Sequence, residues 1–266
     1  MPLKTLIITQ EDCLYLPQFL QTVLRERGRN VVGITILPTL MPKQTWFSTA
    51  REHLEVYGFT QFLKQSIRYV GRKALGIASE RVPLPGYFSV AAVAKQHQIP
   101  ELPTQSVNAP EYHEELRRRG IDLIISINAS QVFKSEILAL PRLGCINVHG
   151  ALLPRYRGRL PSFWVLANGE KETGATVHFM NKNLDDGPIL LQERVEIRPE
   201  DTQDSLIRRT KALGARLVIE AIDRLEAGND ANPVATLPNK KEDATYYSFP
   251  TREDGIRLRQ QGRRLL

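Results

Sequence analysis

The stretch that decides the fold runs from Gly144 to Gly158 and reads GCINVHGALLPRYRG. Its first part, residues 145–149, is a short apolar run typical of a buried strand, and a loop rich in glycine and proline follows it. Asn147 and His149 are two residues apart on this strand, so their side chains share one face. In an open parallel sheet, ligands bind at the carboxyl ends of the strands. The stretch therefore predicts a site where this strand ends.

Working outward, strand-like runs alternate with helical patterns on both sides of this stretch. We expect strands at 3–9, 31–36, 121–127 and 145–149, and helices at 16–27, 89–97, 109–120 and 134–140. Two more strands, 173–180 and 189–197, flank a polar connection and predict a hairpin with a long loop. A long helix is expected over 202–227, with Thr202 as its N-cap. This order predicts an α/β fold, an open and mostly parallel twisted sheet with helices on both faces.

Two segments depart from this alternation. Residues 38–85 are aromatic and basic, and within them residues 59–75 fit an amphipathic helix with a cationic flank. We interpret this segment as a helical insertion packed on its own domain, with a membrane-surface patch and an oligomer contact as alternatives that the sequence leaves open. Residues 228–266 form a basic, Arg-rich extension that we expect to lie on the surface as a solvated tail. The expected organisation is thus a domain over 1–227 followed by this extension.

Composition narrows the class of protein only modestly. The chain has 266 residues, 42% hydrophobic and 24% charged, which excludes a disordered or collagen-like chain. The net charge of +7 suits an anionic ligand such as a nucleotide or folate, as well as nucleic acid. Cys13 and Cys145 predict reduced, buried thiols rather than a disulfide framework. With no long apolar run and no signal-peptide pattern, we expect a cytoplasmic protein without a membrane span.

The side chains of Asn147 and His149 suit a reaction in which an oxyanion develops and a proton moves. A side-chain amide donates a hydrogen bond to a developing oxyanion, and an imidazole moves protons near neutral pH. The alternative is a buried histidine with a satisfied hydrogen bond beside an asparagine that turns the chain. The pair alone does not separate these interpretations.

Further motifs follow in a fixed order. They are Leu152-Leu153-Pro154, Tyr156-Arg157-Gly158, Gly174-Ala175-Thr176-Val177-His178 and Leu184-Asp185-Asp186-Gly187-Pro188. Together with Asn147-Val148-His149, they resemble the formyltransferase family that uses 10-formyltetrahydrofolate. Residues 140–158 look most like methionyl-tRNA formyltransferase, and residues 184–192 are closer to glycinamide ribonucleotide transformylase. The resemblance covers residues 90–227 strongly and residues 1–36 in outline, and it implies a Rossmann-like formyltransferase fold.

The resemblance implies roles for three catalytic residues. Asn147 would hold the formyl oxygen as it gains charge, and His149 would share that role and handle protons. Asp185 would orient His149 or a water that relays the amine proton. Asp186 is a rival for this role, although we expect it to serve loop solvation and turn chemistry. Which of His149 and Asp185 takes the proton stays open, because the two titrate as a coupled site.

The same resemblance implies a pocket for 10-formyltetrahydrofolate as co-substrate, with no metal. One wall would comprise Ser126, Ile127, Asn128 and Val132, and the other Asn183, Leu184 and Asp185. Thr176 and His178 would support the site from the next strand, although His178 could equally be a half-exposed strand residue. Arg157 would lie in the loop that borders the active site.

The acceptor is inferred from what the chain lacks. The first turn, Thr9-Gln10-Glu11-Asp12, carries two acidic residues where glycinamide ribonucleotide transformylase has a glycine-rich phosphate cradle. About 39 residues follow residue 227, too few for the C-terminal barrel of methionyl-tRNA formyltransferase. We therefore expect a small amine acceptor, with an amino-sugar nucleotide as the nearest precedent and tRNA as the less favoured partner. Two other functions remain as alternatives, a folate-binding protein without turnover and an RNA-binding module. Residues 38–85 could also form the contact of a homo-oligomer.

Overall fold

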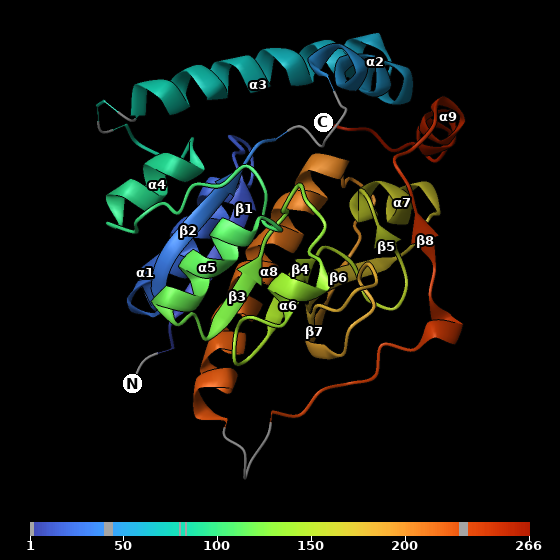
Figure 1. Cartoon of the computed structure of the whole chain (residues 1–266). Helices are drawn as coiled ribbons and strands as arrows, with labels where there is room; N and C mark the ends of the chain where they lie inside the picture. Colours follow the sequence, from blue (N-terminus) through green and yellow to red (C-terminus); the bar gives the residue numbers. More distant parts are fainter. Residues whose placement is uncertain (1–2, 40–44, 80, 83, 229–233) are drawn as a thin grey trace.

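The computed structural model describes residues 3–39, 45–79, 81–82, 84–228 and 234–266. Its main sheet has six strands in the order β2-β1-β3-β4-β6-β7 (Figure 1). The strands are β1 (Thr5–Gln10), β2 (Val31–Leu37), β3 (Leu123–Ser126), β4 (Cys145–His149), β6 (Glu172–Phe179) and β7 (Ile189–Glu196). The first four run parallel, while β6 pairs antiparallel with both β4 and β7. The predicted open, mostly parallel sheet is confirmed.

Helices cover both faces of this sheet, as predicted. Neighbouring residues of β1 fall into different cores: Ile7 packs with the helices α1 and α8, whereas Leu6 packs with α5 and α6. The helices on the first face are α1 (Leu16–Arg27), α4 (Val90–Gln96) and α8 (Gln203–Ala227), and those on the second are α5 (Pro110–Arg119) and α6 (Ser135–Leu138). Because both faces are buried, the strands read as continuous apolar runs rather than alternating ones.

The long helix α8 begins where the sequence predicts. Thr202 is its N-cap, and its hydroxyl accepts a hydrogen bond from the backbone N–H of Ser205 at 3.1 Å. Its buried stripe includes Leu206, Leu213 and Leu217. The helix predicted at 134–140 is shorter than expected, since α6 covers only residues 135–138.

The insertion and the C-terminal extension pack against each other, although they are far apart in the sequence. The insertion forms α2 (Trp46–Tyr57) and α3 (Phe59–Ser79), and the extension forms the short strand β8 (Tyr246–Tyr247) and the helix α9 (Arg252–Gln260). Helix α9 crosses α2 so closely that a Cβ at Gly255 would lie 1.9 Å from the backbone oxygen of Val56. Both helices share a core with α7 (Pro161–Ala167).

The extension is therefore more than the solvated tail that the sequence predicted. Leu258 is 1% exposed and Leu265 is 6% exposed, so two of its leucines are core residues. Strand β8 pairs in parallel with β5 (Arg157–Gly158), the two-residue strand in the loop after β4. The expectation missed this because two isolated leucines among arginines give no periodic signal. The 3-10 turns η1 (Gly28–Asn30) and η2 (Lys241–Asp243) complete the described elements.

Helix α3 lies across one end of the molecule, above α4 and the end of β1 (Figure 1). A Cβ at its Gly76 would lie 2.9 Å from the backbone oxygen of Phe88, just before α4 begins. Within the described residues, no helix is both long enough and apolar enough to cross a membrane.

We predict that Gly187→Ala destabilises the protein strongly. A Cβ at this position would lie 1.9 Å from the backbone oxygen of Phe179, a backbone atom that cannot move without shifting β6. We expect the free energy of unfolding in urea to fall by about 2 kcal/mol or more. Gly71→Ala is the control, because nothing lies within 4 Å of its added Cβ and alanine is the better helix former by about 0.5–1 kcal/mol. Equal effects of the two substitutions would contradict the packing described here.

Candidate active site

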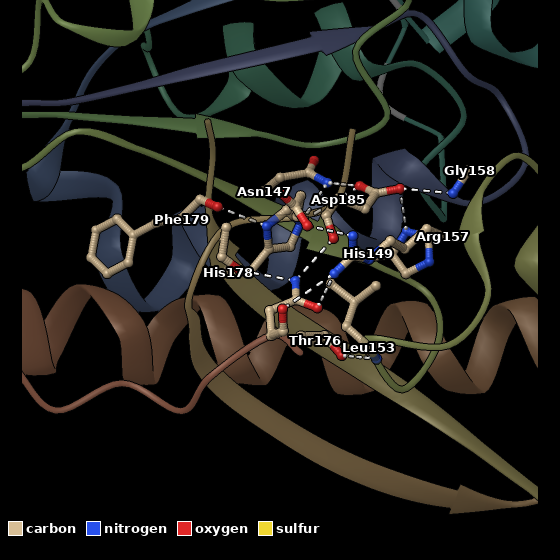
Figure 2. Close-up of polar contacts among 12 residues, drawn as sticks. Asn147, His149, Leu153, Arg157, Gly158, Thr176, His178, Phe179 and Asp185 are labelled. Atoms are coloured by element: carbon tan, nitrogen blue, oxygen red, sulfur yellow. Dashed lines mark hydrogen bonds and ion pairs between the residues drawn. The ribbon is translucent and has the colours of Figure 1, made fainter. Parts of the chain in front are cut away.

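The site is built on three adjacent strands. Strand pairing places Ser126 of β3 opposite Asn147 of β4, and Asn147 opposite His178 of β6. Ser126 and His178 are buried, and Asn147 between them is partly accessible. His149 lies two residues further along β4, at its carboxyl end. The predicted position of the site, at the carboxyl end of this strand, is where the structure gathers polar side chains (Figure 2).

The loop between β6 and β7 brings Asp185 to this row. Its Oδ2 lies 3.5 Å from His149 Nδ1, and its Oδ1 lies 3.6 Å from His178 Nε2. Asn147 Nδ2 donates to Asp185 Oδ1 at 3.4 Å, and the backbone N–H of Gly158 donates to Oδ2 at 2.9 Å. Asp185 has a φ of 51°, in the left-handed region that aspartate tolerates better than most residues. Asn147, His149 and Asp185, predicted from separate motifs, thus meet in one cluster.

The hydrogen bonds assign the protons on both imidazoles. His149 Nε2 lies 2.7 Å from the carbonyl oxygen of Tyr156, which only accepts, so Nε2 carries the proton of the neutral ring. His178 Nδ1 donates in the same way to the backbone oxygen of Phe179 at 2.8 Å. Its Nε2 is then free to accept from Asn147 Nδ2 at 3.3 Å. The lone pair of His149 Nδ1 therefore faces Asp185.

This arrangement sets the charge states near neutral pH. Burial lowers the pKa of His149, and the nearby Asp185 carboxylate opposes that shift without reversing it. Burial would raise the pKa of Asp185, but His149, which is positively charged once it is protonated in acid, and the Gly158 N–H hold that pKa well below its usual range. A neutral imidazole therefore lies beside an ionised carboxylate. A proton that enters between His149 Nδ1 and Asp185 Oδ2 can therefore bind to either atom.

The loop that follows β4 is held by Thr176 and Gln192. Thr176 is fully buried, donates to the backbone oxygen of Ala151 at 2.6 Å and accepts from the N–H of Leu153 at 3.3 Å. Gln192 Nε2 donates to the backbone oxygen of Leu153 at 2.8 Å. Thr176 thus supports the site through the backbone, as predicted. His178 is only 2% exposed, so the alternative of a half-exposed strand residue is wrong.

Asp186 points away from its neighbour and pairs with Arg157. Arg157 Nη1 lies 2.5 Å from Asp186 Oδ1, and both side chains are almost completely buried, at 1% and 5% exposure. Arg157 also donates to the Tyr246 hydroxyl at 2.7 Å and to Asn239 Oδ1 at 2.6 Å. Of the two roles expected for Asp186, loop solvation is therefore wrong, whereas turn chemistry is present, since Asn183 Nδ2 donates to its Oδ2. A buried arginine needs a partner carboxylate, and Asp186 supplies it.

Asn239, from the extension, connects this ion pair to the cluster of Asn147, His149 and Asp185. Its Nδ2 donates to the backbone oxygens of Asp185 and Gly187, each at 2.9 Å. The amide thereby fixes the turn that points one aspartate at His149 and the next at Arg157. Sequence reasoning missed Asn239, and no pattern around it could have revealed the role.

The residues predicted to hold folate divide into a buried and an exposed group. Ser126 and Ile127 are buried, at 3% and 2% exposure. Asn128, Asn183, Leu184 and Val132 are exposed, with Leu184 at 57% and Val132 at 68%. Asn183 Nδ2 donates to Asp186 Oδ2 at 2.9 Å, so one of these side chains is engaged within its own loop.

Lys211 adds a cation that the sequence analysis did not single out. It lies on α8, and its Nζ donates to Asn128 Oδ1 at 2.6 Å. Burial lowers its pKa to about 8. A lysine in the middle of an amphipathic helix gives no sequence signal, which explains why it was missed.

The first turn, after β1, is filled by the chain's own carboxylates. Asp12 Oδ1 accepts from the backbone N–H groups of Leu14 and Tyr15, at 2.6 and 2.7 Å, at the start of α1. The Glu11 carboxylate accepts from Val90 N at 2.9 Å and Ala91 N at 3.2 Å, at the start of α4. The backbone donors that would hold a phosphate in this turn are thus already occupied. Among the described residues, no group of three His, Cys, Asp or Glu side chains is arranged to hold a metal ion.

Comparison with known proteins identifies the family of the chain. A family model described as formyl transferase matches residues 76–222, more than half of the chain. The chain belongs to the formyl transferase family. Methionyl-tRNA formyltransferase of Geobacter metallireducens is 39% identical to it over 184 residues, which is 68% of this chain and 56% of that protein. The chain thus spans little more than half the length of this curated relative.

Solved structures share the formyl transferase fold. An N-formyltransferase from Helicobacter canadensis, in complex with folinic acid and dTDP-3-aminofucose, superposes with a TM-score of 0.57 at 18% identity, covering 92% of this chain and 71% of that one. Glycinamide ribonucleotide transformylase 1 from Symbiobacterium toebii gives a TM-score of 0.57 at 20% identity, covering 88% and 94%. At these identities the likeness concerns the fold alone.

We predict that the stabilisation from Asp185 disappears in acid. Because the folded-state pKa is depressed, this stabilisation is fully present above the unfolded pKa near 4 and is lost as the pH falls through the folded value. The difference in free energy of unfolding between the wild type and Asp185→Asn should be on the order of 2 kcal/mol at pH 6 and shrink progressively as the pH falls below about 4.

Urea unfolding at a series of pH values measures this difference. Asp223→Asn is the control, since Asp223 is half exposed and pairs with Arg27 on the surface. Exposed pairs contribute about 0–1 kcal/mol. If the difference in free energy of unfolding between the wild type and Asp185→Asn does not change with pH, the Asp185 carboxylate is not held ionised.

Proposed function

We propose that this chain transfers a formyl group from 10-formyltetrahydrofolate to a primary amine of a small acceptor. The observation that carries the proposal is the meeting of Asn147, His149 and Asp185 at the carboxyl end of β4, with the Asp185 Oδ2 to His149 Nδ1 distance at 3.5 Å. Membership of the formyl transferase family supports it.

The reaction makes two demands on the protein. A bond forms between the acceptor nitrogen and the formyl carbon, the bond between that carbon and folate N10 breaks, and one proton passes from the acceptor nitrogen to N10. The formyl oxygen gains negative charge on the way, and a donor aimed at it lowers the barrier. The acceptor nitrogen must also lose its proton to a group of suitable basicity.

The cluster contains a residue for each demand. Asn147 Nδ2 makes two long hydrogen bonds, 3.3 Å to His178 and 3.4 Å to Asp185. These bonds hold the amide in place but are weak, so an N–H group can donate to the formyl oxygen instead. Neutral His149, with its Nδ1 lone pair beside ionised Asp185, accepts the proton from the amine directly or through a water. Asp185 stabilises the resulting imidazolium, because an opposite charge at this distance favours the charged form.

The folate would lie between the end of β3 and the loop between β6 and β7. Ser126 and Ile127 are buried beside Asn147 in this arrangement, and Leu184 offers an exposed apolar side chain. Lys211, hydrogen-bonded to Asn128, would supply a positive charge at the same edge of the sheet. Apolar walls with a few polar groups suit a flat aromatic ligand that carries carboxylates.

An amino-sugar nucleotide is the acceptor class that we favour. Asp12 and Glu11 occupy the backbone donors of the first turn, which argues against a phosphate bound there as in a ribonucleotide acceptor. The structure from Helicobacter canadensis contains an amino-sugar nucleotide together with folinic acid, on a shared fold. The positive net charge of +7 suits a diphosphate-linked substrate.

Methionyl-tRNA is the second candidate acceptor. A relative named methionyl-tRNA formyltransferase is 39% identical to this chain, whereas the solved N-formyltransferase with a bound amino-sugar nucleotide is 18% identical. The two candidates differ in salt dependence, because a protein that neutralises many tRNA phosphates loses affinity steeply as salt rises.

A folate-release assay with 10-formyltetrahydrofolate and a panel of amines separates these candidates. We expect release that depends on an amino-sugar nucleotide and varies little with salt. Release that requires charged initiator tRNA would overturn the acceptor class while keeping the chemistry. Tight folate binding without release, for every amine in the panel, would establish a binding protein without turnover.

We predict that Asn147→Ala lowers kcat by roughly 100- to 1,000-fold, the usual loss when one oxyanion donor is removed. His149→Ala should lower it by roughly 100-fold or more, because a general base is lost. Binding of folate, measured by fluorescence quenching, should change little for either variant. His97→Ala is the matched control and should retain wild-type turnover, because His97 is a half-buried histidine just after α4 that is hydrogen-bonded to Gln21. Undiminished turnover in His149→Ala would refute the catalytic assignment.

A further inference from the structure

Helix α3 is amphipathic in the opposite sense to an ordinary surface helix. A surface helix normally turns its apolar stripe toward the core and its charged residues toward solvent. Here the large apolar residues are exposed: Phe59 is 70% exposed, Ile67 66%, Val70 65% and Ile77 52%. Among the residues of this 21-residue helix, only Gly76 is buried. The apolar stripe therefore faces away from the protein.

The polar residues of α3 attach the helix to the rest of the chain. Arg68 pairs with Asp204 at the start of α8 at 2.7 Å. Arg72 donates to the backbone oxygens of Cys13 and Tyr87, at 2.5 and 2.9 Å. Gln61 accepts from the backbone N–H of Leu266 at 3.3 Å. These contacts fix the rotation of the helix about its axis, so the outward direction of the apolar stripe is built into the fold.

The exposed face of α3 carries only positive charge. Phe59, Leu63, Ile67, Val70, Ala74 and Ile77 recur at intervals of three and four residues along a stripe roughly 30 Å long. At 100° per residue, Lys64 lies on one flank of the stripe and Lys73 on the other. No aspartate or glutamate occurs between residues 59 and 79. Trp46, 55% exposed, lies beside Tyr69 and Lys73 of α3 and adds an aromatic ring at the edge.

We propose that the outer face of α3 docks on an anionic lipid surface, with the helix axis in the plane of the membrane. An apolar stripe flanked by lysines, with no acidic residue, has the complementary charge for a layer of anionic headgroups. A second copy of the chain fits less well, because two such faces would bring four lysines together without a carboxylate between them. Helix α3 forms one end of the molecule, and none of the other described elements lies beyond it, so a flat surface can approach it (Figure 1).

Flotation with vesicles of phosphatidylcholine containing roughly a third phosphatidylglycerol tests this docking. The full chain should float with these vesicles and stay behind with vesicles of phosphatidylcholine alone. Ile67→Glu/Val70→Glu should lower the partition coefficient by at least about tenfold, since two charges enter the apolar stripe. Lys64→Gln/Lys73→Gln should lower it by roughly fivefold per lysine.

Ile256→Glu is the matched control, because Ile256 is an exposed apolar residue, 40% exposed, on α9 rather than α3. Its partition should equal that of the wild type, and the thermal midpoints of all variants should agree. Equal flotation of the wild type and Ile67→Glu/Val70→Glu would overturn the proposal. The wild type could instead fail to bind anionic vesicles and form a dimer in light scattering. If Ile67→Glu/Val70→Glu abolished that dimer, the face would be assigned to contact with a second copy of the chain. The test does not depend on the proposed formyl transfer.

Discussion

The buried carboxylate of Asp185 is the constraint on which the rest of the site depends. It lies between two imidazoles, 3.5 Å from one and 3.6 Å from the other, and only 7% of the residue is exposed. An ionised carboxylate at this depth is costly unless donors surround it. The Gly158 N–H and the Asn147 amide provide them, and they come from the loop after β4 and from β4 itself. The loop after β4, the strand and the loop between β6 and β7 are therefore tied to one another through a single side chain.

The neighbouring Asp186 extends this constraint to the C-terminal extension. Asp186 forms a buried ion pair with Arg157, and Arg157 also donates to Asn239 and Tyr246. Asn239 in turn donates to the backbone oxygen of Asp185. The extension then pairs with β5 and packs on α7, while α9 packs on the insertion helix α2. The insertion and the C-terminal extension, which the sequence presents as additions to a sheet, thus complete the surroundings of the cluster of Asn147, His149 and Asp185.

The sequence was sufficient for the sheet and for the placing of Asn147 beside His149, for physical reasons that are local. Buried parallel strands leave continuous apolar runs, and Thr202 with Ser205 leaves a capping signature. The ends of the predicted strands and of α8 therefore agree with the structure to within about two residues. The alternation of side chains on β4 placed Asn147 and His149 on one face. The family resemblance implied Asp185 rather than Asp186, and in the structure Asp185 lies beside His149.

What the sequence could not predict depends on contacts between distant segments. The ion pair that buries Asp186 needs Arg157, 29 residues away, and the role of Asn239 needs a loop 54 residues away. The amphipathic pattern of residues 59–75 predicted a helix, but not that its apolar side faces outward. That orientation follows from Arg68 and Arg72 reaching Asp204 and Cys13, contacts that no local pattern encodes.

The central claim is that His149 and Asp185 act as one proton-accepting unit, and a double-mutant cycle on kcat/KM tests it most directly. The substitutions are His149→Ala and Asp185→Asn, alone and together, assayed with the amine that supports turnover. Residues that act as a unit are strongly non-additive, so we predict that the double variant is about as slow as the slower single variant. Losses that multiply, so that the double variant falls by the product of the two single effects, would show that the residues act independently and would contradict the account.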